Sequence, residues 1–299
     1  MLEGIVRGKR QPPRIVVYGP PKVGKSTLGA DTPAPVFITT EEGVDNLPVD
    51  QFSVAVNWLS FLANVKKVAE GKHDYRTLVI DTINGAADLA AESVCQEMFG
   101  GDWGPKGFGG YARGWAAVSE SMRELLPMLD ACRSRGMVVL LLAHTGVTTV
   151  KNPVSGDYQK FTPDLDKRVW AKLIAWADII LRADYEYSKA EIDGQRRIVS
   201  NSTRILYASG SAVEDAGTRV GFSLPETLPL SWASIEENLG QDAAIGKDIA
   251  ARWNLFSSEQ AAKALAYLGI SDVEEIDGAD FAKAKVVLNR LLTKEQENG

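Results

Sequence analysis

Residues 19–26 read GPPKVGKS and fit the pattern G-x-x-x-x-G-K-[ST] at every fixed position. The apolar residues 15–18 come directly before this octapeptide and predict a buried strand. A strand, a glycine-bearing loop and a helix in this order form an anion site, because the loop N–H groups and the helix dipole both favour a phosphate. We therefore expect an α/β fold built around a phosphate-binding loop.

Within this loop, Lys25 is expected to reach the β- and γ-phosphates of ATP, and the Ser26 hydroxyl to bind Mg²⁺. Pro20 and Pro21 have no N–H group and only shape the loop. The candidate nucleotide-binding residues share one turn of backbone between strand and helix: Gly19, Lys22, Val23, Gly24, Lys25, Ser26 and Thr27.

The 299 residues have the composition of an ordinary globular chain, 45% hydrophobic and 24% charged, which is enough for one large core and a small appendage. No apolar run approaches the roughly 20 residues needed to cross a bilayer, so we expect a cytoplasmic protein without a membrane partner. The net charge of −6 disfavours a uniformly cationic nucleic-acid binder but permits a local basic strip. Cys95 and Cys132 lack metal-site spacing and are expected to be buried apolar residues.

Strand and helix patterns alternate along the chain, and long apolar strands of this kind imply a mainly parallel sheet covered on both faces. We expect a basic arm at residues 1–13, an ATPase core at 14–240 and a small helical C-terminal domain at 241–299. Strands are predicted at 14–18, 36–39, 77–81 and 137–143, helices at 58–68, 84–98, 111–134 and 170–176 and from residue 25, and an antiparallel hairpin at 178–187 and 196–207.

An acidic residue closes the strand at residues 77–81, which reads Leu78-Val79-Ile80-Asp81 after Thr77. Apolar residues that end in Asp at the carboxyl edge of a strand, one βαβ unit after a phosphate-binding loop, form the pattern that holds the Mg²⁺ shell. Asp81 is therefore the second predicted magnesium residue, beside Ser26.

The strand at 36–39 is followed by Glu41 and Glu42. We expect this strand to lie next to the strand of the phosphate-binding loop, which would place Glu41 near the γ-phosphate as the general base. Glu42 is the alternative base, and a solvated acidic loop is the alternative to both.

His144 follows the buried strand at 137–143 and precedes a polar stretch of about twenty residues. A polar side chain at that strand tip can hydrogen-bond a γ-phosphate and link its loss to the order of the next segment. A histidine that merely caps the strand is the alternative. The polar stretch itself is predicted to be a long functional loop.

The order of these motifs resembles the core of RecA-like recombinases over roughly residues 14–208. Three sequence segments are most similar to phage-encoded, RecA-like ATP-binding proteins of the single-strand annealing recombinase family. They are YGPPKVGKST, TEEGVDNLPV and YRTLVIDTINGA. The resemblance implies a RecA-like P-loop NTPase core with a mainly parallel sheet, an antiparallel hairpin and a small helical C-terminal domain.

The resemblance also implies that two segments, residues 99–115 and 145–167, hold single-stranded DNA. Both contain aromatic rings and cations near glycines, as DNA-binding surfaces do, although ordinary surface loops have the same composition. The candidate DNA-binding residues are Trp103, Lys106, Phe108, Tyr111 and Arg113 in the first segment, and Lys151, Tyr158, Lys160, Phe161, Lys167 and Arg168 in the second.

Oligomeric ATPases of this class commonly complete the site with a cation from the next subunit. Arg219 is our first candidate for that cation and Arg204 the second. Because only a short N-terminal stub precedes the core, the filament of RecA-like proteins is less expected here, and a ring or a DNA-dependent homo-oligomer is equally open.

The sequence thus predicts an ATP- and Mg²⁺-dependent, DNA-dependent ATPase that binds single-stranded DNA in recombination, in the cytoplasm of a bacterial host. A single-strand-binding protein is a further candidate partner. The alternatives are a hexameric helicase or packaging motor, and a nucleotide-switched loader or binding module.

Overall fold

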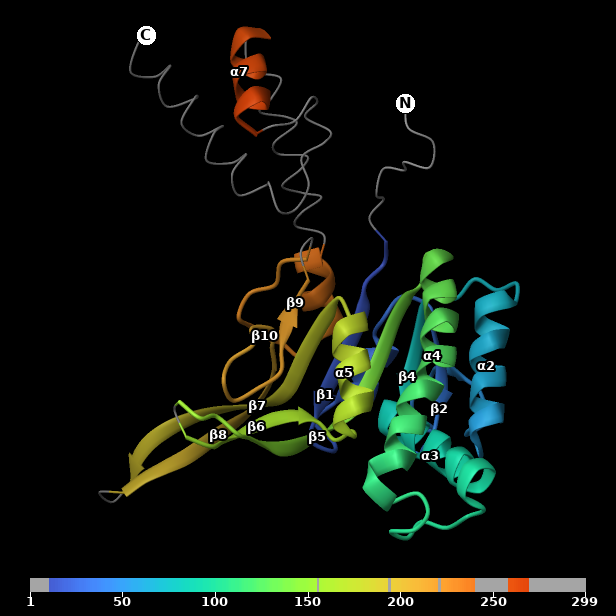
Figure 1. The fold of residues 1–299 in the computed structure, drawn as a ribbon. Helices are drawn as coiled ribbons and strands as arrows, with labels where there is room; N and C mark the ends of the chain where they lie inside the picture. Colours follow the sequence, from blue (N-terminus) through green and yellow to red (C-terminus); the bar gives the residue numbers. More distant parts are fainter. Residues whose placement is uncertain (1–10, 155, 193–194, 220–221, 240–257, 269–299) are drawn as a thin grey trace, which may run out of the picture. The chain divides into compact units, whose positions relative to one another are not determined.

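A computed structural model describes residues 11–154, 156–192, 195–219, 222–239 and 258–268 (Figure 1). The chain divides into two compact units. The first comprises Met1–Gly217 and Thr227–Trp232, and the second comprises Thr218–Glu226 and Ala233–Gly299, so the division runs through the short strand β9 (Gly217–Thr218). Most of the predicted arm at 1–13 and of the predicted C-terminal domain at 241–299 lies outside the described residues; in the latter the structure describes α7 (Ser258–Leu268).

A mainly parallel sheet forms the centre of the first unit, in the order β10-β8-β7-β1-β5-β4-β2-β3. Strands β7, β1, β5, β4, β2 and β3 are parallel neighbours, whereas β8 is antiparallel to β7 and β10. This confirms the predicted parallel sheet with an antiparallel hairpin. The strands are β1 (Arg14–Gly19), β2 (Pro35–Thr39), β3 (Asp50–Gln51), β4 (Thr77–Asp81), β5 (Val138–Val150), β7 (Ile179–Ile192), β8 (Gln195–Tyr207) and β10 (Thr227–Pro229).

The sheet order corrects one expectation, because β2 is not adjacent to β1. Strands β5 and β4 lie between them, so Glu41 leaves the sheet three strands away from the phosphate-binding loop. The central position next to β1 belongs to β5, whose residues Val139 to Ala143 are all fully buried. Because the side chains of this strand are apolar, burying both of its faces is favourable.

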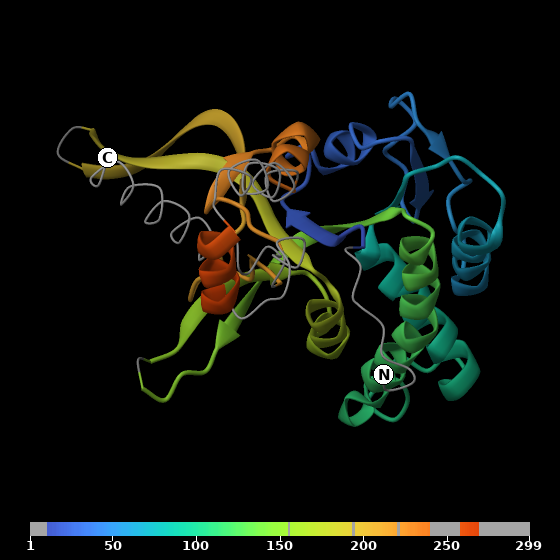
Figure 2. The ribbon, with the colours of Figure 1, turned by 90° about the horizontal axis from the view of Figure 1, so that it is seen from above.

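Helices cover both faces of the sheet. Side chains alternate between the two faces along each strand, so their contacts show which helices cover which face. Val16, Leu78 and Leu141 face a cluster built with helices α2, α3, α4 and α5, whereas Gly29 of α1 packs against Phe37 and Val79 on the opposite face. Figure 2 shows α1 on the side of the sheet opposite to α3, α4 and α5. The helices are α1 (Lys25–Ala30), α2 (Trp58–Glu70), α3 (Ile83–Phe99), α4 (Arg113–Ser134) and α5 (Lys167–Trp176), and a short 3-10 turn, η1 (Gly110–Ala112), precedes α4.

The predicted long loop after residue 144 is wrong, because the chain continues as a β-hairpin. Strand β5 runs seven residues past the predicted end at 143, to Val150, and pairs antiparallel with β6 (Tyr158–Pro163). The alternation of exposed and half-buried residues in β6 is the period of a strand with one free face. Figures 1 and 2 show this hairpin and the β7–β8 hairpin as two arms that leave the layered core.

Both cysteines are free thiols buried in the helical layer, as expected. Burial raises the pKa of Cys132 to about 11. In the described part of the chain, every helix is too short or too polar to span a bilayer.

An ion-pair cluster fixes the starting end of β1 to that of β7. Arg14 donates to both carboxylate oxygens of Asp178, at 2.8 and 3.1 Å, and Arg133 of α4 lies 3.2 Å from the same carboxylate. Burial on its own raises the pKa of Asp178, but the hydrogen bonds and charge of Arg14, with the charge of Arg133, outweigh it, so the pKa lies below its usual value.

We predict that Asp178→Asn lowers the free energy of unfolding by about 3 kcal/mol at pH 7, because it removes the buried carboxylate shared by Arg14 and Arg133 and leaves Arg14 only the half-exposed Asp130. Since folding lowers the pKa of Asp178, its ionised form stabilises the protein at neutral pH, and that contribution is lost as the pH falls through the folded-state pKa. The difference from the wild type should therefore shrink below about pH 4. Urea denaturation of both proteins at pH 7 and below about pH 4 measures this difference in the free energy of unfolding.

The matched control for this prediction is Asp74→Asn, which removes an exposed carboxylate before β4 and should change stability by less than about 0.5 kcal/mol. An Asp178→Asn protein as stable as the control at pH 7 would contradict the assigned role of the cluster.

Candidate nucleotide site

The phosphate-binding loop joins the carboxyl end of β1 to the first turn of α1. Lys22 and Gly24 both adopt left-handed backbone conformations, with φ of 64° and 113°. Left-handed residues within a turn direct successive N–H groups into one concavity, which is the arrangement that receives an anion. The glycine at position 24 removes the backbone strain that a side chain would add at this φ.

Lys25 lies inside this loop, with 6% of its surface exposed. Its Nζ donates to the carbonyl oxygens of Gly19 and Pro20, at 2.9 and 3.0 Å. Burial lowers the pKa of Lys25, and the carboxylates of Asp81 and Glu41 oppose that shift. The ammonium group is thus held by loop carbonyls within the field of two acids.

Ser26 and Asp81, the two residues that the sequence predicts to bind Mg²⁺, are in contact beside the loop. The Ser26 hydroxyl donates to Oδ2 of Asp81 at 2.6 Å. Burial raises the pKa of Asp81, while the Ser26 hydrogen bond and the charge of Lys25 oppose the rise. A hydroxyl and a carboxylate that face each other beside the loop are the hard oxygen ligands that suit Mg²⁺, so these residues fit the ion.

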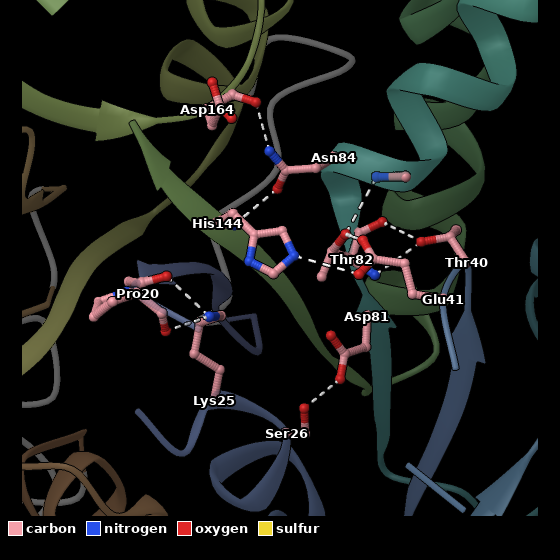
Figure 3. A network of polar contacts seen from close by, with 12 residues as sticks. Pro20, Lys25, Ser26, Thr40, Glu41, Asp81, Thr82, Asn84, His144 and Asp164 are labelled. Atoms are coloured by element: carbon pink, nitrogen blue, oxygen red, sulfur yellow. Dashed lines mark hydrogen bonds and ion pairs between the residues drawn. The ribbon is translucent and has the colours of Figure 1, made fainter. Parts of the chain in front are cut away.

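Glu41 is positioned by the residues that follow β4 (Figure 3). Its Oε1 accepts a hydrogen bond from the Thr82 hydroxyl at 2.7 Å, and its Oε2 lies 3.4 Å from Nε2 of His144. Thr40 and Thr82 also exchange two hydrogen bonds of 3.0 Å. A Cβ built on Gly85 would lie 2.2 Å from the Thr40 hydroxyl, so glycine permits this close approach.

Asn84 connects His144 to the base of the β5–β6 hairpin (Figure 3). Its Oδ1 accepts from the His144 backbone N–H at 2.8 Å, and its Nδ2 donates to the carbonyl oxygen of Asp164 at 2.5 Å. The Asp164 N–H in turn donates to the His144 carbonyl at 2.9 Å. The buried amide of Asn84 therefore fixes both ends of the hairpin next to Glu41.

Tyr18 makes a second connection, from the residue directly before the loop. Its fully buried hydroxyl donates to the carbonyl oxygens of Asp215 and Phe161, at 2.7 and 3.2 Å. The Asp215 carboxylate accepts from Trp170 Nε1 at 2.9 Å and pairs with Lys160 of β6 at 2.5 Å. Strand β1 and the hairpin are thereby joined through one buried phenol.

A cavity of about 460 Å³ lies beside these groups. It brings together the end of β2, the start of α3, the start of α4, the junction of β5 and the turn after β6. Its lining residues are Glu41, Asn84, Ala87, Asp88, Trp115, His144, Asp164, Leu165 and Asp166. The carboxylates in this lining give the cavity negative charge, which disfavours a phosphate backbone inside it.

The first predicted DNA segment, 99–115, contains an aromatic cluster. Phe108 is only 3% exposed and lies 4.7 Å from Trp103 and 5.6 Å from Trp115 between ring centroids. The prediction that Phe108 contacts DNA is therefore wrong, because its ring is used in packing. Tyr111 has a left-handed φ of 51° and a fully exposed side chain.

The two cations of this segment differ in their surroundings. Arg113 donates to the carbonyl oxygens of Gly110 and Lys106, at 3.3 and 3.0 Å, and lies over the ring of Phe99. Lys106 and half of Trp103 are exposed to solvent. Lys106, Trp103 and Tyr111 are thus available on the surface.

In the second predicted segment, 145–167, most cations already have partners. Lys151 pairs with Asp157 across the hairpin end, Lys160 with Asp215, and Arg168 lies 3.4 Å from Asp166. Lys167 is exposed at the start of α5. This segment therefore offers less free positive charge than its composition indicates.

The aromatic rings of the second segment lie on β6. Tyr158 is half-buried, and Phe161 is exposed opposite Val147 of β5 and packs over the Arg182 guanidinium at 4.9 Å. These rings give the hairpin an apolar surface between its paired charges.

Several positioning residues were not foreseen from the sequence, namely Tyr18, Thr40, Thr82, Asn84, Asp164 and Asp215. The one available signal was that Asn84 comes three residues after Asp81, where it begins the helix that follows the acidic strand. Arg219 lies in the second unit, where its carbonyl oxygen accepts from the Phe222 N–H at 3.1 Å, and its role stays a prediction.

Comparison with known proteins agrees with this geometry. The SPbeta prophage-derived uncharacterized protein YorG of Bacillus subtilis (strain 168) is 24% identical over 198 residues, which cover 63% of this chain and 54% of the relative. The chain thus spans about half the length of that relative. The AAA domain family matches residues 11–220, more than half of the chain. The protein therefore belongs to the AAA domain family and carries an AAA-type P-loop ATPase domain.

Proposed function

We propose that this protein hydrolyses ATP with Mg²⁺ and uses the nucleotide state to control binding of single-stranded DNA, as a RecA-like recombination or annealing protein. The observation that carries the proposal is the cavity beside the site, where Glu41 and His144 meet residues from both candidate DNA segments. Trp115 closes the first segment, and Asp164 lies at the end of the second.

In the hydrolytic step, Lys25 and the loop N–H groups bind the phosphates, and Ser26 and Asp81 hold the metal shell. When bound there, Mg²⁺ would neutralise charge on the phosphates. Glu41 orients and deprotonates the attacking water, with its carboxylate fixed by Thr82. The Nε2 atom of His144 contacts Oε2, the other carboxylate oxygen of Glu41, and from that position His144 senses the terminal phosphate.

The coupling step follows from the hydrogen bonds of Asn84. A shift of His144 toward the nucleotide changes the backbone that Asn84 and Asp164 hold, and this backbone is the start of the hairpin. Tyr18, the residue directly before the loop, donates a hydrogen bond to the backbone of β6, the other strand of the hairpin. Two separate links thus transmit the nucleotide state to the same β-hairpin.

DNA contact is assigned to the exposed rings and cations outside the acidic cavity. Tyr111 and Trp103 present aromatic faces in the first segment, and Phe161 presents one on the hairpin. Base stacking on such rings tolerates any sequence, which suits a general single-strand binder. Lys106 and Lys167 supply exposed positive charge next to these rings in sequence.

The roles of the two acids after β2 can be separated by a matched pair of variants. Glu41→Gln should slow ATP hydrolysis by about 10²–10⁴-fold while ATP binding is kept, because only the base is removed. Glu42→Gln, at the exposed neighbour, should leave the rate within a factor of about two. Single-turnover hydrolysis and nucleotide titration measure both. Equal losses in the two variants would contradict the assignment of Glu41.

The functional proposal itself predicts that single-stranded DNA raises the ATPase rate severalfold and that Lys25→Ala abolishes hydrolysis, since the loop loses its cation. The measurement is steady-state phosphate release across oligonucleotide lengths and salt concentrations. Turnover that ignores DNA would favour the loader or binding-module alternative, and turnover retained by Lys25→Ala would refute the nucleotide site.

Tyr111 provides the sharpest test of the DNA surface, since its fully exposed ring can be removed without a packing cost. Tyr111→Ala should weaken single-stranded DNA binding by about 1–3 kcal/mol. Leu59→Ala, which removes an exposed apolar side chain from α2, is the control and should leave DNA binding unchanged. Fluorescence anisotropy with a labelled oligonucleotide measures the affinities, and identical values for both variants would exclude Tyr111 from the DNA surface.

A further inference from the structure

Arg204 lies against the phosphate-binding loop of its own chain. A Cβ built on Gly24 would lie 3.2 Å from Arg204 Nη1 and 3.9 Å from its Cδ. Gly24 caps the N-terminus of α1 and precedes Lys25 directly. The guanidinium group therefore lies next to the loop at Gly24, and both residues belong to the same compact unit.

Strand pairing holds Arg204 in this place. It lies near the end of β8 in register with Tyr185 of β7, and its carbonyl oxygen accepts from the Leu230 N–H at 3.1 Å. Leu230 approaches the loop as well, with its Cδ2 at 3.3 Å from the Cβ built on Gly24. The backbone of Arg204 is thus fixed between two strands, while its side chain reaches the loop.

The charge of Arg204 is not neutralised within the described part of the chain, where no carboxylate forms an ion pair with it. The side chain is exposed, and the residue it approaches, Gly24, lies between Val23 and Lys25 in the phosphate-binding loop. An exposed guanidinium without a carboxylate partner, next to a loop that already carries Lys25, favours a ligand that carries several negative charges. A nucleoside di- or triphosphate meets that requirement at this loop.

We propose that Arg204 binds the phosphate chain of the nucleotide held by its own subunit. This inference rests on the proposed function, and it assigns to Arg204 a role within one chain rather than toward the next subunit. Guanidinium groups bind phosphate oxygens through two N–H groups at once, which lysine cannot do. Because the loop is expected to hold the β- and γ-phosphates, which AMP lacks, a contact made at Gly24 favours ATP and ADP over AMP.

The first test is nucleotide affinity, measured by calorimetry with ATP, ADP and AMP in the slow Glu41→Gln background. Arg204→Ala should weaken ATP and ADP binding about tenfold or more and leave AMP binding nearly unchanged. Arg204→Lys should recover part of the loss. Arg123→Ala, which removes an exposed arginine from α4, is the control and should bind like the background protein. Unaltered ATP and ADP affinity in Arg204→Ala would overturn the proposal.

The second test separates action within one chain from action between chains, by mixing Lys25→Ala protein with Arg204→Ala protein. If Arg204 serves its own loop, each chain lacks a needed cation and the mixture hydrolyses ATP no faster than the sum of its parts. Recovered turnover would show that Arg204 acts on a neighbouring subunit and would refute the proposal. A wild-type protein that binds no nucleotide would instead refute the proposed function.

Discussion

The fold depends on one strand that serves two structures. Strand β5 occupies the centre of the buried parallel sheet up to Ala143 and then continues, without a break, as one side of the exposed hairpin up to Val150. His144 stands at the transition, beside the end of the phosphate-binding strand, with Gly19 as its register partner. Because a strand is stiff along its length, a displacement at His144 is carried into the hairpin rather than absorbed by a loop.

The polar groups around this transition explain how the site and the hairpin are connected. Asn84 binds the backbone on both sides of the hairpin base, and Tyr18 holds β6 from the strand that ends in the loop. Both side chains are buried, so each lost hydrogen bond leaves an unpaired polar group and costs about 1–3 kcal/mol. The hairpin is thus held to helix α3 by Asn84 and to strand β1 by Tyr18.

The sequence was informative where local chemistry decides the structure. The loop at Lys25, the Ser26–Asp81 pair and the parallel sheet all follow from motif spacing and apolar runs. The sequence predicts a loop where the β5–β6 hairpin lies, because the polar, alternating residues of the hairpin lack the apolar run that marks the other strands. The burial of Phe108 does not follow from the sequence, because composition cannot distinguish a buried ring from an exposed one. The contacts of Tyr18 and Arg204 join residues far apart in the chain, which no single sequence pattern reveals.

Hydrogen exchange of the β5–β6 hairpin, with and without a non-hydrolysable ATP analogue, tests the coupling most directly. The account predicts that the analogue slows exchange both in the phosphate-binding loop and in residues 145–163, and that Asn84→Ala keeps the first effect while weakening the second. Protection of the loop alone in the wild-type protein, with the hairpin exchanging at an unchanged rate, would contradict the claim that the nucleotide controls the hairpin.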